Sequence, residues 1–321
     1  SVLCLYFLYF RQNLSVFCKI MERKKANSLD MDCSSKILKN TEDYVSKKLQ
    51  YAYKQTTSDL FGIQIPSYVL RTAIFLSVVI FTFTTRFYLI HEPKHICWDE
   101  THFGKHANFY ITGQFFFDVH PPLAKMTIAS AGLLSGYDGS FPFDKPGDHY
   151  GNHNYIGMRM LCALMGSLCV PLAYLIVWEW TRSTTASVIS SCFILFDTGC
   201  LTISQYILLD PILMFYIMVS VFCVAKFQSF HKSPWSFEWW VWLSLSGINL
   251  ANAFSCKWVG LFVILWAGFA TIVDLWNMLG DLGVSLVMVA KHFIARALCL
   301  IVLPVCVYLF WFAVHFAILR S

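Results

Sequence analysis

The stretch YVLRTAIFLSVVIFTFTTRFYLI, residues 68–90, is almost entirely apolar, and its two charged residues, Arg71 and Arg86, lie near its two ends. A helix needs ~20 consecutive apolar residues to cross a hydrocarbon layer about 30 Å thick. No water satisfies the backbone inside such a layer, and a continuous helix pairs its amide and carbonyl groups internally. The stretch therefore predicts a first membrane-spanning helix within residues 67–90.

The rest of the chain has a similar composition. Hydrophobic residues make up 57% of the sequence and charged residues only 13%, which is about half the charged fraction of a soluble domain. We therefore predict an all-α, multi-pass transmembrane helical bundle with about six further spans in residues 156–321. Their approximate bounds are 156–178, 184–201, 207–224, 239–254, 259–276 and 297–319.

The distribution of positive charge predicts the orientation of these spans. The polar segment 1–66 carries many lysine and arginine residues directly ahead of the first span, and the positive-inside rule places such a segment in the cytosol. We expect it to be a disordered tail. Residues 91–155 then form a luminal loop that includes an interfacial helix near 101–117. The net charge of +5 reflects this topology and indicates no nucleic-acid partner.

Two adjacent carboxylates, Asp99 and Glu100, follow the first span directly. Neighbouring helical residues point about 100° apart, so the two side chains cannot hold the same atom in the same way. One carboxylate can therefore deprotonate a nucleophile while the other orients a partner or the substrate. The alternative is that both are solvated acids of a loop, and the dipeptide by itself does not exclude it.

Further along the loop, His120 and Lys125 flank the diproline Pro121-Pro122. Proline is common at helix starts, so a helix cap explains the pair of prolines. The histidine and the lysine would additionally place a titratable ring and a cation at the membrane surface. Both are candidates for binding a donor or an acceptor.

Arg86 and Arg159 lie at the predicted luminal ends of the first two spans. A cation there costs a few kcal/mol unless it is paired or reaches the water. A lipid-linked phosphate would supply such a pair. The alternative is that both arginines extend toward lipid headgroups.

Three residues near the break between two apolar runs indicate structural roles close to the site. Asp210 and Pro211 match a helix cap followed by the first helical residue, and Asp197 precedes a glycine as at a helix end. We expect them to shape the luminal pocket rather than to act chemically.

The segment His91-Glu92-Pro93-Lys94-His95 has the spacing of an H-E-x-x-H zinc site. That motif needs a continuous helix to bring both histidines to one face, and Pro93 disfavours such a helix. We therefore predict no metal site and no obligatory cofactor.

Read together, several stretches resemble the protein O-mannosyltransferase family, and the resemblance extends from about Pro66 to the end of the chain. The stretches that carry it are Cys97 to Lys105, Phe117 to Lys125, Ser135 to Gly139, Phe196 to Phe215 and Lys291 to Phe316. The family consists of GT-C membrane glycosyltransferases of the endoplasmic reticulum. The resemblance implies transfer of mannose, with inversion, from dolichyl phosphate mannose to Ser or Thr hydroxyls of luminal proteins.

The resemblance also implies roles for the candidate residues. Asp99 matches the proposed catalytic base of the family, and Glu100, Arg86 and Arg159 match its essential charged residues near donor and acceptor. His120 and Lys125 match a motif of its first luminal loop.

Partners and alternatives follow from the same resemblance. It implies a heteromer with the type-1 member of the family. Family members continue beyond the seventh span with luminal MIR domains and more spans, so we expect this chain alone to be inactive. A transferase that uses another polyprenyl-phosphate sugar remains an alternative, as does a non-catalytic polytopic subunit or carrier.

Overall fold

The computed structural model describes residues 67–319, so the predictions for segment 1–66 lie outside the described residues. The described residues divide between two units, with the boundary between Ser77 and Val78. The first contributes only the beginning of helix α3 (Ser67–Phe87) to the described part. The helices after α3 all belong to the second unit.

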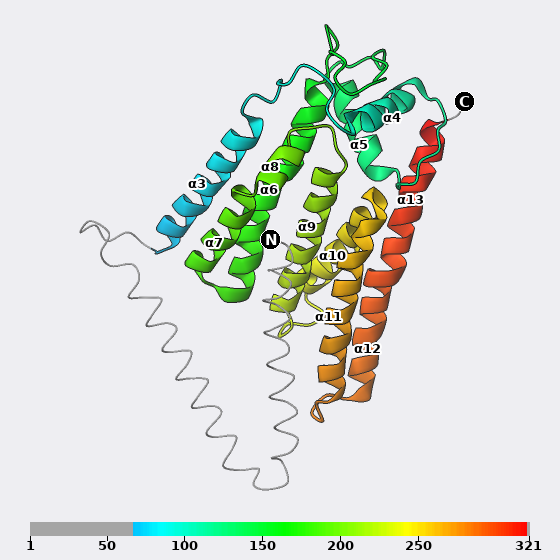
Figure 1. Cartoon of the computed structure of the whole chain (residues 1–321). Helices are drawn as coiled ribbons and strands as arrows, with labels where there is room; N and C mark the ends of the chain where they lie inside the picture. Colours follow the sequence, from blue (N-terminus) through cyan, green and yellow to red (C-terminus); the bar gives the residue numbers. More distant parts are fainter. Residues whose placement is uncertain (1–66, 320–321) are drawn as a thin grey trace, which may run out of the picture. The chain divides into compact units, whose positions relative to one another are not determined.

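The described part is helical, as predicted, and contains no strand between residues 67 and 319 (Figure 1). A single pair of residues, His95 and His149, forms an isolated antiparallel bridge. After α3 the helices are α4 (Glu100–Thr112), α5 (Leu123–Leu134), α6 (Ile156–Thr181), α7 (Thr184–Leu195), α8 (Thr198–Ile203), α9 (Asp210–Ser229), α10 (Phe237–Cys256), a short 3-10 turn η1 (Trp258–Gly260), α11 (Leu261–Leu279), α12 (Leu286–Ala297), a π-helical turn η2 (Leu298–Val302) and α13 (Leu303–Ile318).

Five helical segments among the described residues are long and apolar enough to cross a membrane. They are Tyr68–Phe87, Ile156–Thr181, Asp210–Ser229, Trp258–Leu279 and Leu286–Ile318. Five of the predicted spans therefore correspond to membrane-length helices. The last of these differs in its start, because α12, η2 and α13 continue one another from Leu286.

The two remaining predicted spans are not among these five. The predicted span 184–201 is wrong in its bounds, because α7 ends at Leu195 and Asp197 begins the separate helix α8. With twelve residues, α7 is about 18 Å long and cannot cross about 30 Å of hydrocarbon. Helix α10 has twenty residues but carries the polar side chains of Asn249 and Asn252 within it.

Small side chains bring the long helices close together. Helix α6 packs against α7 and α9, and α9 packs against α10. The buried face of α6 includes Ala163, Gly166, Ser167 and Ala173. Small residues allow close backbone approach where lipid supplies no hydrophobic force between helices.

The helix ends follow local signals in the sequence. Serine side chains accept a backbone N–H at the starts of α7, α10 and α12. Helix α4 ends at Thr112, because Gly113 adopts a left-handed conformation with φ of 73° and donates its N–H to Phe109. The predicted helix 101–117 is therefore shorter than expected.

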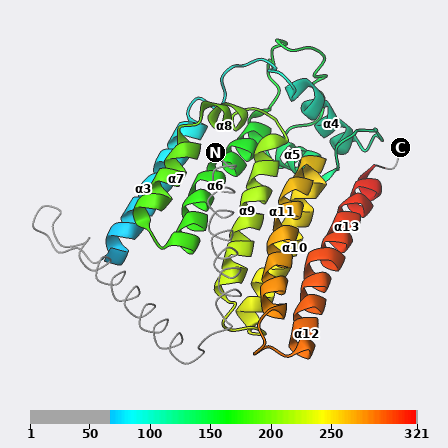
Figure 2. The same ribbon diagram turned by 60° about the horizontal axis from the view of Figure 1, so that its bottom comes forward.

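The segment after α4 folds back onto that helix. Phe116 stacks on His106 with ring centroids 4.6 Å apart. Tyr110 forms a hydrogen bond with His315 near the end of α13, with Oη and Nδ1 2.7 Å apart. In both views α4 and the end of α13 lie at the same end of the second unit (Figure 2). The contact of Tyr110 with His315 thus joins the first loop to a helix that lies 205 residues later in the sequence.

We predict that Gly247→Ala lowers the melting temperature of the complete purified protein. A Cβ at this position of α10 would lie 1.8 Å from the carbonyl oxygen of Cys299 in η2, and a backbone atom cannot move away as a side chain can. The expected loss is about 1–3 kcal/mol. Gly268→Ala in α11 is the control, because a Cβ there meets nothing within 4 Å. Equal melting temperatures for the two variants would contradict the close approach of α10 and η2.

Candidate active site

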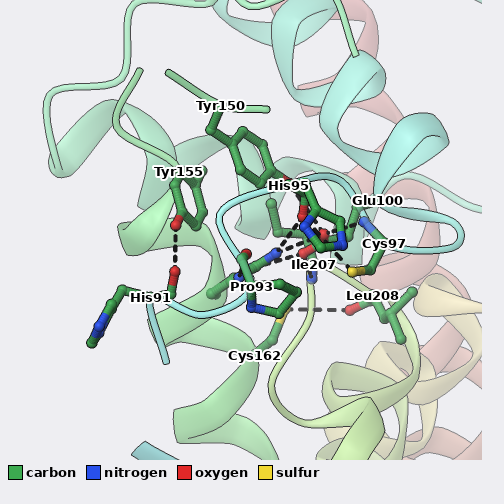
Figure 3. Close-up of polar contacts among 11 residues, drawn as sticks. His91, Pro93, His95, Cys97, Glu100, Tyr150, Tyr155, Cys162, Ile207 and Leu208 are labelled. Carbon is green, nitrogen blue, oxygen red and sulfur yellow. Dashed lines mark hydrogen bonds and ion pairs between the residues drawn. The ribbon is translucent and has the colours of Figure 1, made fainter. Parts of the chain in front are cut away.

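Glu100 is the first residue of α4 and its side chain is wholly buried. Its two oxygens accept hydrogen bonds from Arg159 at the start of α6, from Nε at 2.8 Å and from Nη2 at 2.9 Å. The same carboxylate accepts from the backbone N–H of Cys97 at 2.8 Å and of Ile207 at 3.0 Å, and from the hydroxyl of Tyr150 at 3.1 Å. Figure 3 shows Cys97, Tyr150 and Ile207 around Glu100. A bidentate, charge-assisted pair of this kind is among the stronger hydrogen-bonded arrangements in proteins.

Arg159 is also wholly buried, and its remaining donors bind backbone carbonyls of the segment after α3. Nη1 donates to Pro93 at 2.9 Å and Nη2 donates to His95 at 3.2 Å. The ion pair therefore joins five parts of the chain: the segment 93–97, the start of α4, the loop at Tyr150, the start of α6 and the backbone at Ile207. We call Glu100, Arg159 and these partners the Glu100 hub.

Three tyrosine rings surround the guanidinium of Arg159. The distances from its central carbon to the ring centroids are 5.5 Å for Tyr150, 4.8 Å for Tyr155 and 5.4 Å for Tyr206, within the range of cation–π attraction. Tyr150 and Tyr155 also stack on each other at 3.8 Å. Burial, together with the nearby charge of Glu100, raises the pKa of Tyr150, so its phenol stays neutral and donates to the carboxylate.

Asp99, by contrast, is exposed. It precedes α4, and its backbone carbonyl accepts from His102 and Phe103 at 3.0 and 3.1 Å. Its side chain makes no cap hydrogen bond and has no partner within residues 67–319. The two adjacent carboxylates thus differ in their surroundings, since that of Glu100 is fully hydrogen-bonded inside the protein and that of Asp99 is exposed at its surface.

The second predicted cluster is also built around a buried ion pair. Lys125 is 2% exposed, and its ammonium donates to Asp118 at 2.6 Å and to the carbonyl of His120 at 2.8 Å. Burial by itself would raise the pKa of Asp118, but the hydrogen bond and charge of Lys125 outweigh it, so that this pKa is lowered. Burial lowers the pKa of Lys125, and Asp118 offsets part of that effect. Lys125 therefore fixes the turn before α5 and has no free surface for a ligand.

His120 remains partly exposed beside this pair. Burial lowers its pKa, the charges of Lys257 and Lys125 add to that effect, and Asp118 and Asp210 oppose it. The imidazole thus lies within the electrostatic reach of residues from the ends of α9 and α10. It is the member of the predicted pair His120 and Lys125 that can still meet another molecule.

The predicted cap at Asp210 is wrong. Leu209 precedes α9, Asp210 is its first residue and Pro211 its second. The Asp210 carboxylate instead accepts from the ammonium of Lys257 at 2.8 and 3.0 Å. The turn after α10 brings this ammonium within reach, and both oxygens of the carboxylate bind it.

Arg86 and Asp197 occupy the junction of α3, α7 and α8. Arg86 is wholly buried and donates to the carbonyl of Ile194 at 3.1 Å, while its Nε has no partner in the described part of the chain. The predicted helix end at Asp197 is wrong, because its side chain accepts from Cys200 at 2.7 Å and begins α8. Neither arginine predicted to bind the donor therefore presents free surface.

The residues that sequence reasoning missed are Asp118, Lys257 and the tyrosines around Arg159. Lys257 carried a signal, because it is an isolated cation between two long apolar runs. Asp118 lies within the quoted stretch 117–125 as the opposite charge to Lys125. The tyrosines carried no local signal, since they come from separate segments of the chain.

The H-E-x-x-H segment forms no helix, as its proline predicted, since residues 91–95 lie between α3 and α4. Within the described range 67–319, no three side chains of the metal-binding types lie together.

Comparison with known proteins places this chain in a family. The profile of the family described as dolichyl-phosphate-mannose-protein mannosyltransferase matches residues 76–320. Protein O-mannosyl-transferase 2 of Danio rerio is 55% identical over 80% of this chain and 33% of its own length. The Drosophila melanogaster protein of the same name is 48% identical over 76% of this chain and 32% of its own length. The chain thus spans about a third of the curated relatives it matches.

A solved structure agrees with the fold. One chain of the S. cerevisiae protein O-mannosyltransferase Pmt1-Pmt2 complex bound to the sugar donor superposes with a TM-score of 0.75 and 33% sequence identity. The superposition covers 84% of this chain and 36% of that one. The family profile, the curated relatives and the helical architecture agree: the chain belongs to the dolichyl-phosphate-mannose-protein mannosyltransferase family.

Proposed function

We propose that the complete protein containing this chain transfers mannose from dolichyl phosphate mannose to Ser or Thr hydroxyls of polypeptides in the lumen of the endoplasmic reticulum. The names of the relatives support the donor and the reaction. The observation that carries the proposal is the free carboxylate of Asp99, held next to the saturated and buried Glu100.

In the proposed reaction Asp99 is the general base. A serine or threonine hydroxyl is a weak nucleophile at neutral pH, so a positioned carboxylate accelerates its attack by accepting the proton. The acceptor oxygen bonds to the anomeric carbon as the bond to the phosphate oxygen breaks, and the phosphate leaves with the electron pair. Attack opposite a β-linked phosphate gives an α-mannoside.

Glu100 and Arg159 act in this proposal as positioning residues. Both are buried with their hydrogen-bonding groups occupied, so neither has a free group for the substrate. Their contribution is to fix the start of α4 and with it the place of Asp99, because a base displaced by about 1 Å loses much of its effect. We assign Arg86 a similar role at the junction with α7.

His120 is assigned to contact with the donor or the acceptor, and Lys125 to holding the turn that carries it. The ammonium groups of Lys257 and Lys125 near His120 are paired with Asp210 and Asp118, so the imidazole is the group of this cluster that is left to contact the donor or the acceptor.

Orientation and assembly complete the proposal. We place residues 91–155 on the luminal side, with the segment 1–66 in the cytosol, on the basis of the positive charge ahead of α3. We further propose a heteromer with a type-1 member of the family, which is supported by the two-protein complex formed by the solved yeast relative.

We predict that Asp99→Asn in the complete protein, expressed with its type-1 partner, lowers mannosyl transfer to an acceptor peptide by about 100-fold or more. The amide has the size of the carboxylate but does not accept the proton. Assembly with the partner stays intact, because the Asp99 side chain supports no contact within the described residues. Asp144→Asn is the control, since Asp144 is an exposed acid of the same loop with one long contact, 3.9 Å to Lys105. Undiminished transfer by Asp99→Asn would refute the assigned base.

Glu100→Gln is predicted to act on stability as well as on activity. It leaves the buried guanidinium of Arg159 without a counter-charge, and breaking a buried ion pair costs about 3–5 kcal/mol. The melting temperature of the complex and its resistance to trypsin should both fall. In the double variant Glu100→Gln/Arg159→Gln the loss should be smaller than the sum of the single losses, as a double-mutant cycle would measure. Full stability of Glu100→Gln with loss of transfer alone would assign Glu100 a chemical role instead.

A further inference from the structure

Trp98 immediately precedes the proposed base and lies in an unusual position. Its side chain is 58% exposed and its φ is 47°. A bulky residue in the left-handed region is a conformational outlier, and such outliers are found at sites where the surrounding structure imposes them. The exposed ring therefore lies beside the proposed base, on a backbone position that the surrounding structure fixes.

The ring of Trp98 packs against the ring of Tyr206. Their centroids are 5.1 Å apart at an interplanar angle of 60°, and Tyr206 in turn lies over the guanidinium of Arg159 at 5.4 Å. A continuous series of contacts therefore runs from the buried Glu100 hub through Tyr206 to the exposed indole. The hub orients the base and the aromatic surface together.

We propose that Trp98 and Tyr206 form a platform that binds the mannosyl ring of the donor. This inference rests on the proposed function. The face of an aromatic ring is electronegative, and it attracts the C–H groups of a sugar face, whose hydrogens carry partial positive charge. The platform thereby selects a pyranose ring and adds sugar recognition to lipid and phosphate binding.

Stereochemistry explains why platform and base are neighbours. In a β-linked mannose the hydrogens on C1, C3 and C5 all project from one face of the ring, whereas the axial hydroxyl on C2 projects from the other. An acceptor oxygen that displaces a β-linked phosphate with inversion must approach C1 from the same C–H-rich face. The base must therefore lie on the face that the platform contacts, with the rings under C3 and C5 so that C1 stays open to the acceptor. Adjacent residues, with Cα atoms about 3.8 Å apart, can meet that requirement.

An exposed tryptophan also suits a membrane–water interface, where it anchors a protein in the headgroup region. An anchor of that kind would not distinguish a lipid phosphate that carries mannose from one that does not. A contact with the acceptor peptide would not distinguish the two lipids either. Measuring the binding of both forms of the lipid therefore separates recognition of mannose from these two other roles.

The test uses Trp98→Leu in the complete protein with its type-1 partner. Two quantities are measured in one transfer assay: the KM for dolichyl phosphate mannose, and the Ki of dolichyl phosphate as a competitive inhibitor. We expect the KM to rise about tenfold, the equivalent of a lost aromatic contact, while the Ki stays within about twofold of wild type. Trp98→Phe should restore most of the donor affinity, and Tyr206→Leu should change the two constants in the same direction as Trp98→Leu.

Both constants describe the folded, active fraction, so a lower yield of a variant does not alter them. Trp276→Leu is the matched control. Trp276 is a tryptophan of α11 that is 66% exposed, and we expect no change in either constant for this variant. Equal changes in KM and Ki, no change in either, or a rise confined to the KM of the acceptor peptide would each overturn the platform. Such a result with transfer still dependent on Asp99 would leave the proposed function standing.

Discussion

The arrangement of the candidate site depends on one buried ion pair, that of Glu100 with Arg159. Both side chains are removed from water, which by itself is unfavourable, and the arrangement is stable only because their polar atoms are paired. The carboxylate accepts from Arg159, from a tyrosine hydroxyl and from two backbone N–H groups, while the guanidinium also binds two backbone carbonyls. These bonds join segments that are up to 107 positions apart in the chain. The backbone N–H and C=O groups of these non-helical segments thereby find hydrogen-bond partners within the protein, at one end of an apolar helical bundle.

The ion pair also explains why one of two adjacent carboxylates is buried and the other is exposed. Because successive residues at the start of a helix point in different directions, fixing Glu100 inward leaves Asp99 directed away from the hub and exposed. The same series of contacts supports Tyr206 and, through it, the exposed ring of Trp98. A buried interaction that has no free group for substrate thus determines what the surface presents.

The other half of the first loop is held by separate contacts. Lys125 binds Asp118 and the carbonyl of His120, and Tyr110 binds His315 at the end of α13. Consequently the loop is attached both to α6, through Arg159, and to the last helix of the described part. The partly exposed His120 lies between these attachments, in reach of the charges of Asp210 and Lys257.

Composition and apolar run length determined that the chain is a membrane-spanning helical protein, because every backbone group in lipid needs an internal partner and a helix is the local way to supply it. The order of local motifs also determined the family, and it predicted Asp99, Glu100, Arg159 and Lys125 as residues of the candidate site. The tertiary structure decided which of these are buried and which are free. It also decided that Asp210 binds Lys257 rather than capping α9, that Asp197 starts a helix, and that three tyrosines surround Arg159. Hydrophobic periodicity and capping depend on neighbours in sequence, whereas the partner of a charge depends on which distant segments the folded chain brings within a few ångströms.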